Sequence, residues 1–188
     1  MSIDAAFFNQ LYEGNDDPWN FTTNSYELFR YQRICDVIQN KKHAWIFEAG
    51  CSIGILTAKL AQFAEQVEAI DISEVAIQHA QKKCQHINNI TFSASTLLDY
   101  AMSPATDLII LSEIGYYFTH SEWRLILDKI ITQMRPNSYI LASHWLGQSS
   151  DHLISGDAVQ DTFSLFSNLY EVHQEQHPGF RLGYWLKK

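Results

Sequence analysis

From Ala44 onward, short apolar runs alternate with amphipathic segments of helical period, and this alternation leaves few folds open to the chain. The expected strands cover residues 44–49, 66–71, 89–94, 106–112, 139–145, 168–175 and 180–187. The helices expected between them cover residues 54–64, 74–86, 121–134 and 158–165. Strands that alternate with helices form a mostly parallel sheet covered on both faces. We therefore predict an α/β fold with a seven-stranded, mostly parallel sheet.

Two more helices are expected before the first strand, at residues 3–13 and 25–38. Asn24 and Glu27 are spaced as in a capping box, in which each side chain accepts a hydrogen bond from the other residue's backbone N–H. A chain of 188 residues can bury one substantial core. We predict a single domain over residues 1–188, with a helical cap at 1–42 and a sheet-containing core at 43–188.

Composition excludes several classes of partner. The formal charge of −8 and the pI near 5.4 argue against nucleic acid, because its binding requires a basic surface. No window of about 18 apolar residues suggests a membrane span, and the start of the sequence does not read as a signal peptide. Three unpaired cysteines and scattered histidines predict neither disulfides nor a metal site. We expect a cytoplasmic protein, either a monomer or a homodimer.

The segment from Glu48 to Gly54 combines the end of a strand, a turn with two glycines and the start of a helix. Glycine lets the backbone of such a turn adopt positive φ and lets a ligand approach closely. The next expected strand ends at Asp71, where a carboxylate can accept hydrogen bonds from ribose hydroxyls. Both features lie at the carboxyl edge of the sheet, so the sequence predicts a Rossmann-like site for a nucleoside-containing cofactor.

The glycine spacing argues against a nicotinamide-dependent oxidoreductase. Counted from Gly50, the G-x-G-x-x-G pattern would need glycine where Ser52 and Ile55 stand. Glu48, Gly50 and Gly54 instead match the E-x-G-x-G-x-G pattern of methyltransferases, with Ser52 at the middle glycine. We expect the turn to tolerate Ser52 only with a negative φ.

Several further segments carry a more specific resemblance. They are Asp17-Pro18-Trp19, Tyr26-Glu27, Arg30-Tyr31, Glu48 to Thr57, Asp71-Ile72-Ser73, Ser112 to Tyr117 and His144-Trp145. Over about residues 7–160 the chain resembles the nodulation-protein-S-like family of class I methyltransferases, which N-methylate an amino sugar of a chitooligosaccharide. The resemblance implies S-adenosylmethionine as methyl donor, S-adenosylhomocysteine as product and N-terminal helices that close over the cofactor.

On this basis we expect a cofactor site that includes Asp71 at the ribose and Trp19 as a lid. Tyr26 and Arg30 share a helix face and are expected to meet the cofactor carboxylate, although Tyr26, Phe29 and Arg33 could equally dock that helix on the sheet. The full set of expected cofactor-binding residues is Trp19, Tyr26, Arg30, Glu48, Ala49, Gly50, Gly54, Asp71, Ile72, Ser95, Thr96, Leu97 and Ser112.

Methyl transfer to an amine needs a group that binds the ammonium or takes its proton. Glu113 follows the fourth strand and is the first candidate, and His144 at the end of the fifth strand is the alternative base. Tyr117 is also expected among the catalytic residues. The aromatic residues Tyr116, Tyr117, Phe118, Trp123 and Trp145 suit either a sugar-stacking surface or the core. We expect N-methylation of a small amine such as an amino sugar. O-methylation of another metabolite and a non-catalytic cofactor-binding module remain open.

Overall fold

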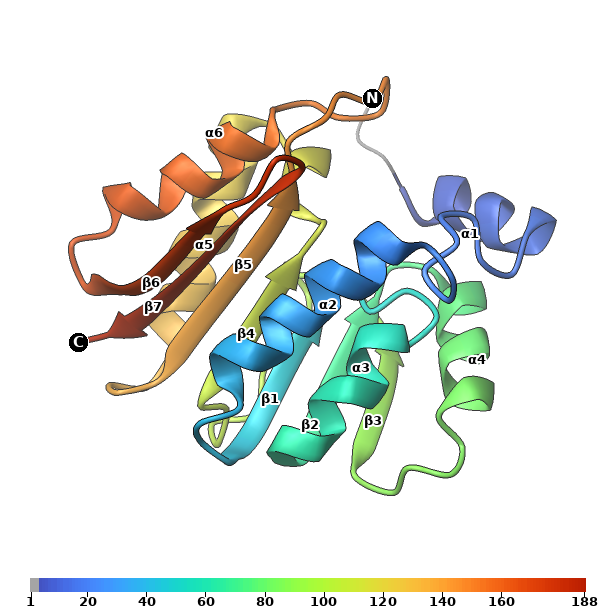
Figure 1. The fold of residues 1–188 in the computed structure, drawn as a ribbon, viewed down its shortest axis with the longest axis horizontal. Helices are drawn as coiled ribbons and strands as arrows, with labels where there is room; N and C mark the ends of the chain where they lie inside the picture. The colour runs from blue at the N-terminus through green and yellow to red at the C-terminus, as the bar shows by residue number, and fades with distance from the viewer. Residues whose placement is uncertain (1–3) are drawn as a thin grey trace.

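The computed structural model describes residues 4–188 and places their strands in one sheet with helices on both faces (Figure 1). The strands are β1 (His43–Ala49), β2 (Ala64–Asp71), β3 (Ile90–Ala94), β4 (Leu108–Ser112), β5 (Tyr139–Trp145), β6 (Leu169–Gln176) and β7 (Phe180–Lys187). The sheet has seven strands in the order β3-β2-β1-β4-β5-β7-β6. β7 pairs antiparallel with β5 and β6, and the other pairs are parallel. The predicted α/β fold with a seven-stranded, mostly parallel sheet is confirmed.

The helices and helical turns follow the expected order. They are α1 (Ala5–Gly14), α2 (Ser25–Ile38), α3 (Ile55–Leu60), η1 (Ala61–Phe63), α4 (Glu74–Lys83), η2 (Gly115–Tyr117), α5 (His120–Gln133), α6 (Gly156–Asp161) and η3 (Thr162–Leu165). The expected helix 54–64 is divided into α3 and the 3-10 turn η1, and β2 begins at Ala64. Thr119 and Glu122 form the capping box that their spacing predicts at the start of α5. The first helix was expected from Ile3, which lies outside the described residues.

Two apolar layers hold the helices on the sheet. On one face, α2 and α3 pack against alternate residues of the central strands, such as Ile34 of α2 near Ile46 and Leu108. On the opposite face, α5, α6 and η3 cover the other set of strand residues, with Trp123 and Phe163 fully buried. In Figure 1, α2 and α3 lie in front of the sheet and α5 lies behind it. The central strands are therefore buried on both faces, as parallel sheets require.

The second helix is a layer of the core and does not belong to a cap. Tyr31, Ile34 and Ile38 of α2 are buried in the sheet-facing cluster. The capping box expected at its start is also wrong: the Asn24 side chain accepts from the backbone N–H of Tyr26, and Glu27 pairs with Arg30. Glu27 is drawn inward because the buried guanidinium of Arg30 needs a counter-charge.

The first helix lies across the carboxyl edge of the sheet, beside α4 (Figure 1). Asn9 accepts a hydrogen bond from the hydroxyl of Ser73 at 2.7 Å, and Tyr12 donates to Ser52 at 2.6 Å. Phe8 packs edge-on against Tyr117, with ring centroids 5.3 Å apart. These contacts connect α1 to loops that follow three different strands. Among residues 4–188, no helix is both long enough and apolar enough to span a membrane.

Candidate active site

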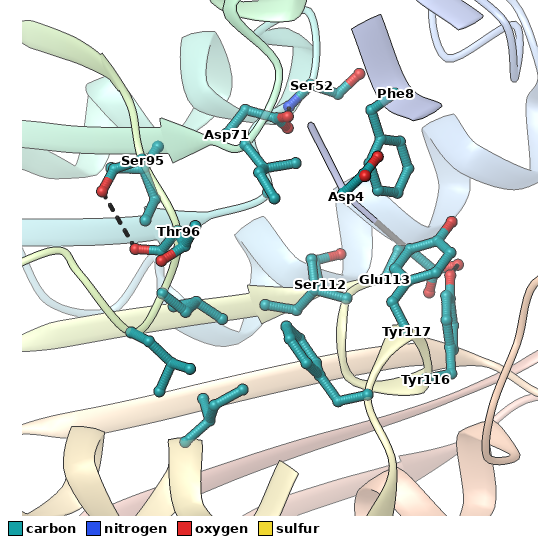
Figure 2. A pocket seen from close by; sticks show the side chains of 18 of the residues that line it. Asp4, Phe8, Ser52, Asp71, Ser95, Thr96, Ser112, Glu113, Tyr116 and Tyr117 are labelled. Carbon is teal, nitrogen blue, oxygen red and sulfur yellow. Dashed lines mark hydrogen bonds between the residues drawn. The ribbon is translucent and has the colours of Figure 1, made fainter. Parts of the chain in front are cut away.

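A cavity of about 530 Å³ opens at the carboxyl edge of the sheet, between the loops after β1, β2, β3 and β4 and beneath α1. Its size is typical of small-molecule sites. Figure 2 shows Ser52 and Asp71 close together in the cavity wall, with Ser112 and Glu113 in another part of the wall. The sequence-predicted residues that line it are Trp19, Gly50, Asp71, Ile72, Ser95, Thr96, Leu97, Ser112, Glu113 and Tyr117.

The glycine-rich turn forms one wall of the cavity. Gly50 and Gly54 have φ values of 71° and 79°, a region that L side chains rarely adopt. A Cβ at Gly50 would lie 2.3 Å from Cγ2 of Ile114, another lining residue. Gly50 therefore lets Ile114 pack against the turn in the cavity wall, while Gly54 forms the N-cap of α3. Ala49 and Gly54, which were also expected to bind the cofactor, flank the turn but do not line the cavity.

Asp71 is positioned by two backbone groups at the end of β2. Its Oδ2 accepts from the N–H of Ser52 at 2.8 Å, and its Oδ1 accepts from the N–H of Ser73 at 2.9 Å. The residue is only 8% exposed, and burial raises the pKa of its carboxyl despite these backbone donors. Each carboxylate oxygen keeps a further lone pair, so Asp71 can still accept hydrogen bonds from a ligand.

The expectation for the backbone of Ser52 is wrong. Its φ is 50°, in the left-handed region that favours glycine. Its N–H is held by Asp71 and its hydroxyl oxygen by Tyr12. Because α1 and β2 supply both partners, tertiary contacts maintain a backbone conformation that serine disfavours when isolated.

Glu113 directly follows β4 and lines the cavity, and its backbone is strained at φ 59°. Its Oε2 accepts from the hydroxyl of Tyr116 at 2.8 Å, and its Oε1 accepts from the N–H of Trp145 at 2.8 Å. Burial raises the pKa of this carboxyl, and the nearby Arg30 opposes the shift. A half-buried, oriented carboxylate of raised pKa is suited to exchange a proton with a ligand.

Arg30 is not available to a cofactor carboxylate, contrary to our expectation. Its guanidinium is 1% exposed and donates to Glu27 and to the hydroxyl of Ser112. The same guanidinium lies 3.7 Å from Glu113. Burial opposes its charge, but the two carboxylates outweigh that effect and the pKa of Arg30 is raised. Arg30 therefore serves as the counter-charge beneath Glu27 and Glu113, which both line the cavity.

Tyr26 also lies away from the cavity. Its hydroxyl donates to the carbonyl of Gly179 at 2.9 Å and its ring packs edge-on against Phe180. Phe29 contacts the same hairpin, and Arg33 binds Glu175 at 2.8 Å. This helix face was expected either to meet the cofactor or to dock the helix on the sheet. In the structure it docks α2 on β6 and β7.

His144, the alternative base, does not reach the cavity. It is fully buried beneath α6, and its Nε2 accepts from the N–H of Gly115 at 3.0 Å. Burial lowers the pKa of its imidazole to about 3. A ring whose acceptor nitrogen is already occupied and whose basicity is so weak cannot take a proton from a ligand in its present position.

The aromatic cluster divides between the core and the cavity. Tyr116 and Trp123 are buried, at 3% and 0% exposure, and the ring of Tyr116 stacks on His152 at 3.7 Å. Tyr117 and Phe118 are half-buried and line the cavity together with the buried Tyr116. Sequence patterns missed Phe8, Tyr12 and Glu27 as lining residues, because the period of a helix does not say which face meets a ligand.

Glu48 lies beneath the glycine turn, outside the cavity lining, although it was expected at the cofactor. It is 2% exposed, and its Oε2 has no hydrogen-bond partner among the described residues. Burial raises the pKa of this carboxyl to about 8. The folded protein therefore retains a proton on Glu48 that the unfolded chain releases near pH 4.3.

We expect this retained proton to make stability fall as pH rises. A raised carboxyl pKa favours folding below the unfolded pKa of about 4.3, and the benefit is lost as pH approaches about 8. Each tenfold change in proton affinity is worth about 1.4 kcal/mol. Glu48→Gln should therefore reduce the loss of unfolding free energy between pH 5 and pH 8, measured by urea denaturation. The exposed Glu65→Gln is the control, and an unchanged pH slope in Glu48→Gln would contradict the assignment.

Within the described part of the chain, no group of three or more His, Cys, Asp or Glu side chains is arranged to hold a metal ion. The cavity lining instead contains carboxylates on several elements, namely Asp4, Glu27, Asp71, Asp99, Glu113 and Glu122. Among residues 4–188, none of the lining residues is lysine, arginine or histidine. The cavity is therefore an acidic environment that favours a positively charged ligand.

The sequence is similar to one protein family over most of its length. A family model described as Nodulation protein S (NodS) matches residues 9–177. Nodulation protein S of Azorhizobium caulinodans is 26% identical over 149 residues, which are 76% of this chain and 71% of that protein. Nodulation protein S of Bradyrhizobium diazoefficiens is 23% identical over 128 residues, or 67% of this chain. The matched region spans only 61% of the latter protein.

Solved structures share the fold at low sequence identity. The N-methyltransferase NodS from Bradyrhizobium japonicum WM9, in complex with S-adenosylhomocysteine, superimposes with a TM-score of 0.81 and 22% identity, covering 95% of this chain and 97% of that one. Magnesium protoporphyrin IX methyltransferase from Synechocystis PCC 6803, with bound SAM, gives 0.74 and 16% identity, covering 99% and 98%. The chain thus has the Rossmann-like class I methyltransferase fold.

Proposed function

The chain belongs to the nodulation protein S family, and from that membership we propose that it transfers a methyl group from S-adenosylmethionine to a small amine. One observation carries the proposal: the glycine turn and Asp71 meet in the wall of a cavity at the carboxyl edge of the sheet. Open α/β sheets bind nucleoside-containing ligands at this edge.

The residues in the cavity fit such a cofactor. The carboxylate oxygens of Asp71 keep lone pairs that can accept from ribose hydroxyls. Gly50 lines the cavity without a side chain and is suited to lie against the methionine portion. The loop Ser95–Thr96–Leu97 and Ile72 line the same part of the cavity as Asp71 and are suited to the adenine. Trp19 packs against Tyr12 at 5.7 Å between ring centroids and can cover the ligand from the side of α1.

The cofactor supplies an activated methyl group, so that an N–C bond forms while the S–C bond breaks and its electron pair remains on sulfur. The protein must hold the acceptor nitrogen in line and accept the proton that the amine loses. Glu113 is the carboxylate best placed for this role, because it lines the cavity and is oriented by Tyr116 and the N–H of Trp145. Tyr117 lines the cavity beside it and is suited to position the acceptor.

The charge of the cavity supports an amine as the acceptor. The described lining contains carboxylates but no lysine, arginine or histidine. This negative charge disfavours carboxylate and phosphate acceptors and favours an ammonium group. Tyr117 and Phe118 offer half-buried aromatic faces of the kind that contact sugar rings. We therefore propose an amino sugar, as in a deacetylated chitooligosaccharide, in preference to a hydroxyl acceptor.

Calorimetric titration with S-adenosylhomocysteine tests the cofactor assignment. We expect saturable one-to-one binding and no binding of NADH. Asp71→Ala should weaken binding by about 1–3 kcal/mol, or about five- to 150-fold, because the ribose hydroxyls and the N–H of Ser52 lose their acceptor. A folded Asp71→Ala variant that binds with wild-type affinity would contradict the proposed cofactor site.

A transfer assay with labelled S-adenosylmethionine tests the acceptor. The matched pair is a deacetylated chitooligosaccharide and its fully acetylated counterpart, which differ only in the free amine. We expect the label to be transferred only to the deacetylated chitooligosaccharide. Equal label on both would favour O-methylation, and binding of the cofactor without transfer to any acceptor would favour a non-catalytic binding module.

The proposal extends to the setting in which the chain acts. We expect one domain over residues 1–188 that works in the cytoplasm as a monomer or homodimer, without nucleic acid. Light scattering of the purified protein and fractionation of its cells test these points. A net charge of −8 favours solubility and disfavours a polyanionic partner.

A further inference from the structure

We propose that Ser52, oriented by Tyr12, donates a hydrogen bond to the bound cofactor that a glycine at this position could not make. The inference rests on the proposed cofactor and concerns the middle position of the glycine turn. Ser52 and Tyr12 both line the cavity, and Ser52 keeps a left-handed φ of 50° there. Glycine would fit this backbone without strain, so the backbone conformation does not account for serine at this position.

The hydroxyl of Tyr12 determines how Ser52 can bond. Tyr12 is 3% exposed and donates to Oγ of Ser52 at 2.6 Å. Burial, reinforced by the nearby Asp71, raises the pKa of Tyr12, so the phenol keeps its proton and remains a donor. Trp19 and the contact of Asn9 with Ser73 hold the Tyr12 region of α1 in place.

A serine hydroxyl has one hydrogen to donate and two lone pairs. The bond from Tyr12 uses a lone pair of Oγ, and no acceptor for the hydroxyl hydrogen occurs among residues 4–188. The backbone N–H of the same residue donates to Asp71. The hydroxyl hydrogen is therefore free on a residue that lines the cavity and whose backbone holds the carboxylate proposed to bind the ribose, so it can meet a polar atom of the cofactor. Tyr12 acts as a positioning residue, because it reaches the ligand through Ser52.

The test is calorimetric titration with S-adenosylhomocysteine of the wild type, Ser52→Ala, Ser52→Gly, Tyr12→Phe and the double variant Tyr12→Phe/Ser52→Ala. Each single variant should raise Kd by about three- to tenfold, as expected for one hydrogen bond. The double variant should bind no more weakly than Ser52→Ala, since both changes break one chain of hydrogen bonds.

Urea denaturation separates this role from a structural one. Glycine adopts a positive φ without strain, whereas alanine does not. The Ser52→Gly variant should therefore have the higher free energy of unfolding of the two. Both lack the hydroxyl and should bind the cofactor equally weakly. Wild-type affinity in Ser52→Gly, or effects of Tyr12→Phe and Ser52→Ala that multiply, would overturn the inference. If the wild type itself fails to bind, the proposed function fails as well; if all variants bind like the wild type, only this inference fails.

Discussion

Glu113→Gln is expected to lower kcat by about 100- to 10,000-fold, the usual contribution of a positioned acid–base group. The amide keeps an oxygen that can accept from the hydroxyl of Tyr116, but it carries no charge for an ammonium and takes no proton. Affinity for S-adenosylhomocysteine should change little, because Asp71 and the glycine turn are left intact. Steady-state kinetics with an amine acceptor, alongside calorimetry, provide both measurements.

The pH profile of this variant distinguishes its role further. When pH rises above the pKa of the acceptor amine, the amine arrives neutral and depends less on Glu113. The difference in kcat between the wild type and Glu113→Gln should therefore become smaller at high pH. Glu65→Gln, an exposed carboxylate change on β2, should behave like the wild type. Full activity of Glu113→Gln at neutral pH would exclude the carboxylate as proton acceptor.

Arg30→Met is expected to reduce the free energy of unfolding by about 3–5 kcal/mol, the usual result when one partner of a buried ion pair is removed. Methionine fills much of the same volume but leaves Glu27 and Glu113 without their shared counter-charge. Urea denaturation followed by tryptophan fluorescence measures the change.

The same helix offers a matched control for Arg30. Arg33 pairs with Asp36 and Glu175, but its side chain is 32% exposed. Ion pairs open to solvent contribute about 1 kcal/mol or less, so Arg33→Met should cost much less than Arg30→Met. Adding Glu27→Gln to Arg30→Met should restore part of the lost stability, because it removes one buried charge. Equal losses for Arg30→Met and Arg33→Met would contradict the proposed counter-charge.

The arrangement around Arg30 also explains the acidity of the cavity. One guanidinium stands beneath two carboxylates, so at full ionisation this group carries a net negative charge toward the ligand. Such a charge favours the sulfonium of the cofactor and the ammonium of an acceptor. It also raises the energy of an anionic acceptor in the same space.

Much of the site could be predicted because its residues stand at strand ends. Gly50 and Glu113 directly follow parallel strands and Asp71 is the last residue of one, and the carboxyl ends of parallel strands share one edge of the sheet. Their approach to one cavity follows from topology alone. His144 is the penultimate residue of β5 in the same sheet, yet its ring lies beneath α6 and away from the cavity. Position along a strand does not reveal which helix covers a given face.

The order of strands and helices, the glycine turn and the cap of α5 depend on residues close together in the chain, so apolar period and backbone preference were sufficient to predict them. The partners of Arg30, the left-handed backbone of Ser52 and the place of α2 in the core depend on segments far apart in the chain. Those contacts form only when α1, α2 and the sheet pack together, and buried charges and hydroxyls then take the partners that remove them from water at least cost. Local pattern predicts where an element begins and ends, whereas the direction and partner of each polar side chain are decided by tertiary packing.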